Sequence, residues 1–457
     1  MKEKFLSPNL GYGPEFSFID IGLKDKICII EPETCFWGIV ETDEFIDGVK
    51  GLLEEYLDHE EELKKEMKLL RFGLKPSAVY FNPTEKCNLN CKYCYIPKDI
   101  RRYGVSMTKN DITRYLTKLK EFFGNFDFDV KPQIIFHGSE PLMLKDEIFE
   151  SIEEFKDDFI FGIQTNGTLL TSDDISFIKD RDISIGVSLD GVSEEVANKT
   201  RTDWSGKGYF DKVIKVIEEF ADYPKLNVMV TVTKHNQKRL SEIVDFFHTM
   251  GVCSIMLNPV RCTQEGGREL KPEDESLLKD FISALDRAFY LFERTGRKIV
   301  ISNFANLISA ILGPTTRKLM CDISPCGGGR CFFALGARGD VFPCSEFIGI
   351  EKFNGGNINS SDLEGILNSR PFKEVTSRKI ELFYPCSKCS IRHFCGAPCP
   401  AEVYNMYGNL SHPSPYCFFY QGLVQYAFRL IASGKEKAFL WNDWEKDVDL
   451  VYEKQGD

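Results

Sequence analysis

The sequence has little of what would place a protein in a membrane, outside the cell or on a nucleic acid. No window of its 457 residues approaches the about eighteen consecutive apolar residues of a transmembrane helix. The N-terminus, Met1–Ser7, lacks the apolar core of a secretion signal, and no block of like charges forms a tail. Acidic residues outnumber basic ones by 69 to 57, and the net charge of −12 disfavours a phosphate-binding surface. We therefore expect a cytoplasmic protein with no membrane or nucleic-acid partner.

Cysteine, in contrast, is abundant, with sixteen residues in the chain. In a cytoplasmic protein this number indicates metal sites rather than disulfides. Three cysteines form one spaced group and eight form another. The length allows two or three domains, and the 43% hydrophobic content is that of a globular protein.

The first 76 residues have the pattern of a small α+β module. Apolar, β-branched runs predict strands at Glu15–Ile21, Lys26–Glu31 and Cys35–Val40, and a charged helical stretch follows at Asp43–Leu70. Cys28 and Cys35 lie within apolar strand sequence, so we expect small buried side chains rather than metal ligands.

From residue 77 to 260 short apolar runs alternate with amphipathic helical segments. The predicted strands are Ala78–Asn82, Gln133–Phe136, Phe159–Thr165, Ile183–Leu189, Asn227–Val232 and Ser254–Asn258. Helices are predicted between them, for example at Thr108–Phe123, Tyr209–Phe220 and Arg239–Met250. This alternation predicts a parallel sheet of six β/α units, whose chemistry would lie at the C-terminal ends of the strands.

A cysteine triplet follows the first of these strands. Cys87, Cys91 and Cys94 have C-x3-C-x2-C spacing, enough for three corners of a [4Fe–4S] cluster, which leaves one iron open for a small ligand. Zinc is the alternative, but zinc sites of this kind usually add a second C-x2-C pair, and none follows within about forty residues. The triplet resembles the signature of radical S-adenosylmethionine (SAM) enzymes. That resemblance implies a partial (β/α)6 TIM-type barrel, an open iron that binds SAM, and its cleavage to a 5′-deoxyadenosyl radical.

The same resemblance implies a set of SAM-binding residues at successive strand ends. His137–Pro141 is similar to the family's Gly-Gly-Glu-Pro motif, with Ser139 in place of the second glycine. The strands that follow end in Gln164–Gly167 and Ser188–Gly191, and a later arginine matches one that pairs with the methionyl carboxylate. The implied SAM-contacting residues are Tyr93, Gly138, Ser139, Glu140, Thr165, Asn166, Ser188, Asp190 and Arg201.

The second group of cysteines lies between residues 321 and 420. Its spacing is similar to that of the SPASM extension of radical SAM enzymes, which implies two auxiliary [4Fe–4S] clusters and hence three clusters in all. Four of the cysteines alone could instead hold one zinc ion. The resemblance assigns Cys326, Cys331, Cys344 and Cys399 to the first auxiliary cluster and Cys386, Cys389, Cys395 and Cys417 to the second.

Within the first set, Cys331 is the least secure ligand because the short form of the motif does not require it. Without it, one iron would be open to substrate, or Cys321 would be a substitute ligand or a catalytic thiol. Glu346, next to Ser345, is a candidate proton acceptor, and Asp322 and His393 are further candidates because they lie close to ligands in the sequence.

The remaining segments are a helical bridge, 261–320, with a long helix predicted at Glu273–Arg294, and a helical tail, 421–457. The N-terminal module resembles, in layout only, the leader-recognition modules of peptide-modifying enzymes; the alternative is an extension that packs on the barrel.

The whole pattern predicts a radical SAM oxidoreductase that abstracts hydrogen from a ribosomally made precursor peptide and forms a thioether cross-link. Its electrons would come from a reductant such as flavodoxin or ferredoxin. Two alternatives remain: a sulfatase-maturing enzyme that oxidises Cys or Ser to formylglycine, and a non-catalytic iron–sulfur electron-transfer protein. Sulfatase-maturing enzymes have an aspartate directly after the third cysteine of the first auxiliary set, where this chain has Ser345.

Overall fold

The structure is a computed structural model that describes residues 15–73, 75–128, 130–313, 317, 320–442 and 444. The predicted tail, 421–457, lies partly outside the described residues.

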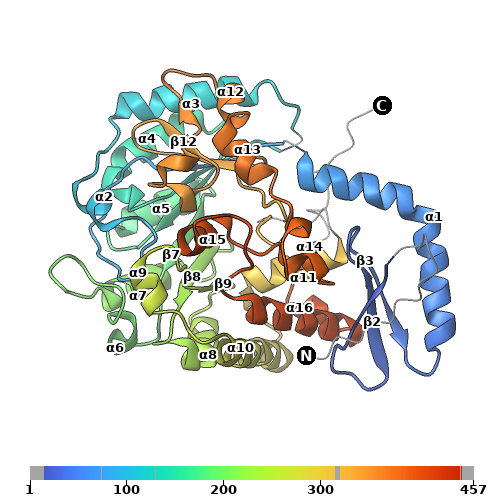
Figure 1. Cartoon of the computed structure of the whole chain (residues 1–457). Helices are drawn as coiled ribbons and strands as arrows, with labels where there is room; N and C mark the ends of the chain where they lie inside the picture. Colours follow the sequence, from blue (N-terminus) through green and yellow to red (C-terminus); the bar gives the residue numbers. More distant parts are fainter. Residues whose placement is uncertain are drawn as a thin grey trace.

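The N-terminal module is a three-stranded antiparallel sheet with one long helix. Strands β1 (Ser17–Ile19), β2 (Lys26–Glu31) and β3 (Phe36–Glu41) are paired in sequence order, and α1 (Phe45–Phe72) follows them. Cys28 and Cys35 are buried, as predicted. The helix is charged along most of its length, and only Tyr56, Met67, Leu70 and Arg71 are buried. Its first half packs on β3, where Leu52 lies against Gly38. Figure 1 shows this module at the right-hand edge of the molecule.

The larger sheet confirms the predicted fold class, an α/β partial barrel. Its parallel part runs β10 (Val300–Ile301), β9 (Ser254–Pro259), β8 (Leu226–Val232), β7 (Ser184–Ser188), β6 (Ile160–Thr165), β5 (Gln133–Phe136) and β4 (Ala78–Phe81). The strands from β4 to β9 match the six predicted strands to within a residue or two at either end. Along β4, β8 and β9 buried apolar residues alternate with half-buried ones, so one face of each strand is buried and the other is partly exposed.

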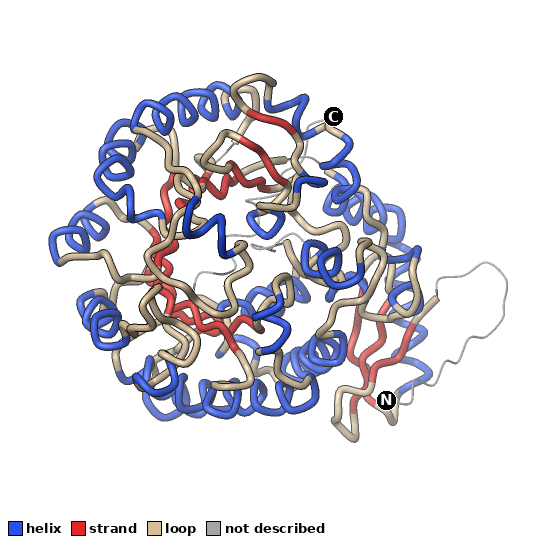
Figure 2. Tube along the Cα trace, turned by 60° about the vertical axis from the view of Figure 1, so that its left-hand side comes forward, coloured by secondary structure: helices blue, strands red, loops and turns tan. Residues whose placement is uncertain are grey.

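Helices surround the outside of this sheet, and its strands form a curved wall in Figure 2. The helices between β4 and β9 are α2 (Lys98–Tyr103), α3 (Lys109–Phe123), α4 (Lys145–Phe155), α5 (Ser172–Asp180), α6 (Glu194–Ala197), α7 (Phe210–Glu219) and α8 (Leu240–Thr249). The predicted bridge contains α9 (Glu265–Glu269), α10 (Asp274–Thr295) and α11 (Ser302–Leu312), together with β10. The bridge is therefore not only a linker, because β10 extends the sheet beyond β9.

The C-terminal region continues the same sheet on its other side. Strand β11 (Phe332–Leu335) pairs in parallel with β4, and β12 (Asp340–Phe342) and β13 (Gly356–Asn357) follow in antiparallel order. The helices of this region are α12 (Leu363–Leu367), α13 (Arg370–Thr376), α14 (Arg392–Cys395), α15 (Pro400–Tyr407) and α16 (Cys417–Ala432), with short 3-10 turns η4 (Ser345–Phe347) and η6 (Ile380–Leu382).

One apolar core joins the three regions. Buried residues of the N-terminal sheet, the barrel strands and α16 belong to a single cluster of contacting side chains. Trp37 of β3, for example, packs edge-on against Phe428 of α16 and donates a hydrogen bond of 2.8 Å to the Ile311 carbonyl. In the part of the chain that is described, no helix is long and apolar enough to cross a membrane.

Candidate radical SAM and iron–sulfur sites

The cysteine triplet lies in a loop after β4 that two other segments hold in place. The backbone N–H of Cys87 donates to the Arg101 carbonyl in α2 at 3.0 Å. The N–H groups of Asn90 and Lys92 donate to the carbonyls of Thr202 and Thr200 at 2.7 and 2.9 Å. The loop is therefore fixed by backbone contacts, which leave the cysteine side chains available as ligands.

The three thiols of this loop lie close to one another, and all three cysteines are half-buried. Burial raises the pKa of each, that of Cys94 to about 11, and the charges of Cys91 and Cys94 also raise the pKa of Cys87. A buried thiolate is unfavourable without a positive partner, so three gathered thiols suit a cationic iron group that stabilises the thiolate form. The residues present therefore fit an iron–sulfur cluster with three protein ligands.

The Gly138–Pro141 loop is tied to the end of the neighbouring strand β6. Gly138 has φ +108°, and a Cβ atom there would lie 2.3 Å from Oδ1 of Asn82, so only glycine fits. Ser139 donates from its hydroxyl to the Glu85 carbonyl at 2.7 Å. The Glu140 side chain is buried, and its carboxylate accepts from the Thr165 hydroxyl at 2.6 Å and from the Asn166 N–H at 2.8 Å.

A second polar network joins the triplet loop to the end of β7. The Tyr93 hydroxyl donates to Oδ2 of Asp190 at 2.5 Å and accepts from Nη1 of Arg201 at 2.6 Å. Asp190 is buried, and its other oxygen accepts from the Thr231 N–H at 2.9 Å. Ser188, the last residue of β7, is half-buried beside it. The structure thus brings the predicted SAM-contacting residues to one edge of the sheet, in two groups around the triplet.

Three residues that support the triplet were not predicted from the sequence. Asn88 donates to the Thr168 hydroxyl at 2.7 Å and accepts from the Asn166 amide at 2.8 Å. Trp204 donates to the Cys87 carbonyl at 2.9 Å, and Arg101 donates to the Ile96 carbonyl at 3.0 Å. Trp204 comes from a segment more than a hundred residues downstream and has no local signal. Asn88 could have been predicted, because it is a polar residue between two cysteines of the triplet.

A fifth cysteine, Cys321, lies beside the four of the first auxiliary set. The Cys321 thiol is close enough to the thiols of Cys326 and Cys399 for their charges to raise its pKa, and it acts in the same way on Cys344. Cys331 is also close enough to raise the pKa of Cys326, but it is 4% exposed in the apolar core and its sulfur accepts from Nη1 of Arg330 at 3.4 Å. Cys321 is an exposed residue, but the protein atoms around its thiol still raise the pKa of the thiol by desolvation.

The second auxiliary set is gathered around α14 and the start of α16. Burial raises the pKa of Cys395 well above its ordinary value, and the charges of Cys389, Cys417 and Cys386 act in the same direction. The pKa of Cys386 is raised to about 12, first by burial and then by Cys417 and Cys389. The four predicted ligands therefore lie near one another, although Cys417 is far from the rest in the sequence.

Arg378 lies between the two auxiliary sets. Its guanidinium is buried and donates to the carbonyls of Leu410, Gly396 and Ala397 at 2.8 to 3.2 Å. The thiols of Cys326 and Cys399 from the first set and of Cys386 and Cys395 from the second are all close enough for their charges to raise its pKa, although burial has the larger effect and lowers it. A fixed positive charge at this position would favour electron-rich groups on both sides.

A cluster of one arginine and two glutamates lies beside the first auxiliary set and consists of Arg261, Glu346 and Glu402. Nε of Arg261 is 3.8 Å from Oε1 of Glu346, and its Nη1 is 3.6 Å from Oε2 of Glu402. Among the described residues, Oε2 of Glu346 is buried and has no hydrogen-bond partner. Burial raises the pKa of Glu346 to about 7, Arg261 lowers it and Glu402 raises it. Glu346 is therefore poised to gain or lose a proton near neutral pH.

Tyr95 connects this cluster with the cysteine triplet. The charges of Glu346, Cys94 and Cys344 all raise the pKa of its hydroxyl, although burial is the main cause, so Tyr95 lies near the triplet and the first auxiliary set. Its ring stacks on that of His137 with centroids 6.5 Å apart. Among the described residues, neither the Tyr95 hydroxyl nor Nδ1 of His137 has a hydrogen-bond partner.

The other two candidate proton-transfer residues are engaged elsewhere. Asp322 accepts from Nε of Arg317 at 2.8 Å. His393 is fully buried, with its Nε2 at 3.4 Å from Glu381 and 3.7 Å from Glu33 of the N-terminal module. Both residues have structural partners, so Glu346 is the stronger candidate.

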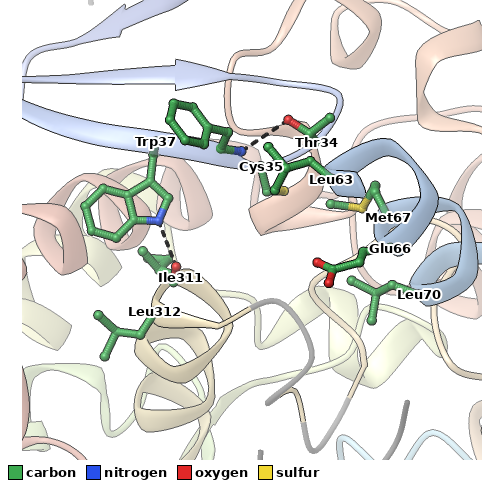
Figure 3. Close-up of a pocket in the computed structure, with 10 residues that line it drawn as sticks. Thr34, Cys35, Trp37, Leu63, Glu66, Met67, Leu70, Ile311 and Leu312 are labelled. Atoms are coloured by element: carbon green, nitrogen blue, oxygen red, sulfur yellow. Dashed lines mark hydrogen bonds between the residues drawn. The ribbon is translucent and has the colours of Figure 1, made fainter. Parts of the chain in front are cut away.

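The N-terminal module has a small apolar pocket where it meets the barrel. The pocket has a volume of about 180 Å³ and lies between β3, α1 and the end of α11. Figure 3 shows Trp37, Leu63, Met67 and Leu312 around it, with the Glu66 carboxylate as the charged group on its wall.

Comparisons with known proteins agree with this geometry. The family model of the radical SAM superfamily matches residues 81–247, and that of SPASM, an iron–sulfur cluster-binding domain, matches residues 326–390. An uncharacterized protein of Archaeoglobus fulgidus is 42% identical over 91% of this chain and 94% of its own length. The cysteine-type anaerobic sulfatase-maturating enzyme of Clostridium novyi is 25% identical over 77% of this chain and 93% of its own length.

Two solved structures share the fold. The anaerobic sulfatase-maturating enzyme anSMEcpe with bound SAM has a TM-score of 0.70 at 20% identity, over 82% of this chain and 98% of its own. Streptococcus suis SuiB, bound to its precursor peptide SuiA, has a TM-score of 0.58 at 16% identity, over 89% of this chain and 99% of its own.

Proposed function

The chain belongs to the radical SAM superfamily and carries a SPASM domain, and on this basis we propose that it abstracts a hydrogen atom from a polypeptide substrate. The family is one of enzymes, which argues against the non-catalytic electron-transfer alternative. The observation that carries the proposal is the gathering of three thiols, Cys87, Cys91 and Cys94, beside the polar ends of β5 to β7. When bound there, a [4Fe–4S] cluster and SAM would supply a 5′-deoxyadenosyl radical.

The residues around the triplet would hold SAM in two ways. Glu140 already binds Thr165 and Asn166, so we assign it the role of fixing the loop in which Gly138 allows close backbone approach. The Tyr93 hydroxyl holds Arg201 and Asp190 in one network. The Arg201 guanidinium would bind the methionyl carboxylate of SAM, and the Asp190 carboxylate would accept hydrogen bonds from its ribose hydroxyls. Both networks are in place before the cofactor binds, so little ordering is needed on binding.

For the first auxiliary cluster we propose Cys321, in place of Cys331, as the fourth ligand beside Cys326, Cys344 and Cys399. The support is the proximity of the Cys321 thiol to those of the other three, whereas Cys331 lies in the apolar core beside Arg330. With Cys321 as ligand every iron would have a protein thiolate, and Cys321 would not be a catalytic thiol. The second cluster would keep the predicted set, Cys386, Cys389, Cys395 and Cys417. The total of three clusters is part of the proposal.

Glu346 would accept the proton that leaves the substrate, at its buried Oε2 atom. It differs in position from the aspartate that sulfatase-maturing enzymes place directly after the corresponding cysteine, where this chain has Ser345. Arg261, which is near both Glu346 and Glu402, would keep the carboxylate oriented.

We propose a precursor peptide as the substrate and a thioether cross-link as the product. By structure, anSMEcpe aligns with 82% of this chain, whereas SuiB, solved with a precursor peptide, aligns with 89%. The additional N-terminal module offers the apolar pocket of Figure 3 as a place to anchor one side chain of such a peptide. Formylglycine formation is the second candidate, favoured by the sequence identity to sulfatase-maturating enzymes.

The test uses protein reconstituted anaerobically with iron and sulfide and incubated with SAM, dithionite and peptides encoded beside its gene. The proposal expects 5′-deoxyadenosine and a peptide that has lost two hydrogens but kept its sulfur. A formylglycine product would favour the second candidate, and an absence of 5′-deoxyadenosine would refute both. The variant Leu63→Glu, in the pocket, should weaken peptide binding without changing 5′-deoxyadenosine formation in the absence of peptide.

A further inference from the structure

A cavity of about 640 Å³ lies next to the cysteine triplet. It is bounded by the triplet loop, α2, α9 and the segment after β8. Cys91 and Cys94 are part of its wall. Helix α9 closes one side so tightly that a Cβ atom on Gly266 would lie 2.1 Å from the Lys92 carbonyl. Among the described residues, none of those proposed to contact SAM lines this cavity. It therefore offers an approach to Cys91 and Cys94 that is lined by other residues than those proposed to contact SAM.

The rim of the cavity is basic, in a chain whose net charge is −12. Lys92, Lys98 and Lys234 line it and are exposed, with Arg101 buried behind them. The acidic residues of its lining are Glu265 and Glu269. Across the described part of the chain, no ion pair engages any of these three lysines. Their charge is therefore directed to solvent, or to a partner.

The lysines also lie close together. Lys199, whose Nζ is 3.6 Å from Oε1 of Glu195, lies near the cavity lining because the Lys92 N–H donates to the carbonyl of the next residue, Thr200. The charges of Lys234, Lys199 and Lys92 all lower the pKa of His235, although burial is the larger cause. Such a concentration of like charge is unfavourable for the folded protein by itself, and it becomes favourable when a negative surface covers it.

We infer that this surface, defined by Lys92, Lys98, Lys234 and His235, is the docking site of an acidic one-electron carrier protein that reduces the iron–sulfur group held by Cys87, Cys91 and Cys94. The inference rests on the proposed function. Electron transfer weakens steeply with distance, so a donor must approach the triplet closely, and Cys91 and Cys94 are reached through this cavity. The basic rim favours a partner that presents a negative surface.

The transfer balances without any covalent change in this chain. One electron leaves the reduced carrier, which is oxidised by one unit, and the same electron reduces the iron–sulfur group by one unit. The exposed lysines bind and orient the carrier and take no part in bond making.

The experiment compares the variant K98E/K234E with the control K65E/K68E, which makes the same change in net charge on exposed lysines of α1, at the far side of the molecule in Figure 1. Two quantities are measured: the Kd of oxidised flavodoxin for each protein at low and high salt, and the rate of 5′-deoxyadenosine formation without peptide, driven by reduced flavodoxin or by dithionite. Iron content and circular dichroism check that the variants fold and load.

We expect K98E/K234E to weaken flavodoxin binding and the flavodoxin-driven rate by about tenfold or more at low salt, because steering by charge accounts for about that much of association. The neutral variant K98Q/K234Q should be intermediate, and the dithionite-driven rate should stay unchanged. Flavodoxin binding that is the same in K98E/K234E and the control would overturn the inference. An equal loss of the dithionite-driven rate would also overturn it, since the lysines would then serve the cluster or the substrate. Wild-type protein that binds flavodoxin at these lysines but yields no 5′-deoxyadenosine with either reductant would support docking and refute SAM cleavage.

Discussion

The assignment of Cys321 as a cluster ligand gives a prediction that iron analysis can decide. Three four-iron clusters require about twelve irons per chain. Cys321→Ser removes a thiolate from the first auxiliary set, so we expect about eight irons and the loss of one electron paramagnetic resonance signal after reduction. Cys331→Ser should keep about twelve irons, because its sulfur lies in the apolar core beside Arg330.

In the iron-free protein the order should be reversed: Cys331→Ser should lower the free energy of unfolding more than Cys321→Ser. Cys331 is 4% exposed, so a serine there buries a hydroxyl, which we expect to cost about 1–2 kcal/mol of unfolding free energy. Cys321 is accessible, and its serine variant should unfold close to the wild-type temperature when iron is absent. Iron and sulfide assays on anaerobically reconstituted protein provide the count, and thermal unfolding of the iron-free protein provides the stability. A Cys331→Ser protein with about eight irons, beside a Cys321→Ser protein with about twelve, would refute the assignment.

Three further predictions follow from the site. Because burial raises the pKa of Glu346 to about 7, its carboxylate form increases as the pH rises through 7; peptide modification should be half-maximal near pH 7 and level off about one pH unit higher, and Glu346→Gln should be slow and flat in the same pH series. Gly138→Ala would place Cβ 2.3 Å from Asn82 at φ +108°, which should cost on the order of 2–4 kcal/mol, seen as a lower unfolding temperature and a weaker SAM affinity. Tyr93→Phe removes the hydroxyl that is 2.5 Å from Asp190; with a loss of about 1–3 kcal/mol, SAM should bind roughly 5- to 150-fold more weakly in equilibrium dialysis, and an unchanged affinity would contradict the proposed network.

The strands of the barrel were predictable because each is a short apolar run between amphipathic helices. Gln133–Phe136 agrees at both ends, since its four apolar or neutral residues are bounded by Pro132 and His137. Strands β10 and β13 were not predicted, because two residues cannot display a period. Their pairing depends on the backbone of a neighbouring strand, which no local pattern reveals.

The candidate site shows the same division between local and distant information. Spacing predicted the three cysteines of the triplet and the polar residues at the ends of β5 to β7, because strand ends of one sheet meet at one edge. The Arg261, Glu346 and Glu402 cluster was not predictable, because its members come from three segments that only the fold brings together. Nor can spacing decide between Cys321 and Cys331, since each lies five residues from Cys326 and they differ only in surroundings.

Strand β4, which leads into the cysteine triplet, pairs on one side with β11 from the C-terminal region. The paired backbones are separated by about 250 residues, as the bond between Ser77 and Cys331 illustrates with a separation of 254. At a synthesis rate of about 5–20 residues per second, this edge stays uncovered for roughly tens of seconds while the chain emerges from the ribosome. An open strand edge is a template for misassociation, so the nascent barrel needs shielding until its last partner strand has been translated.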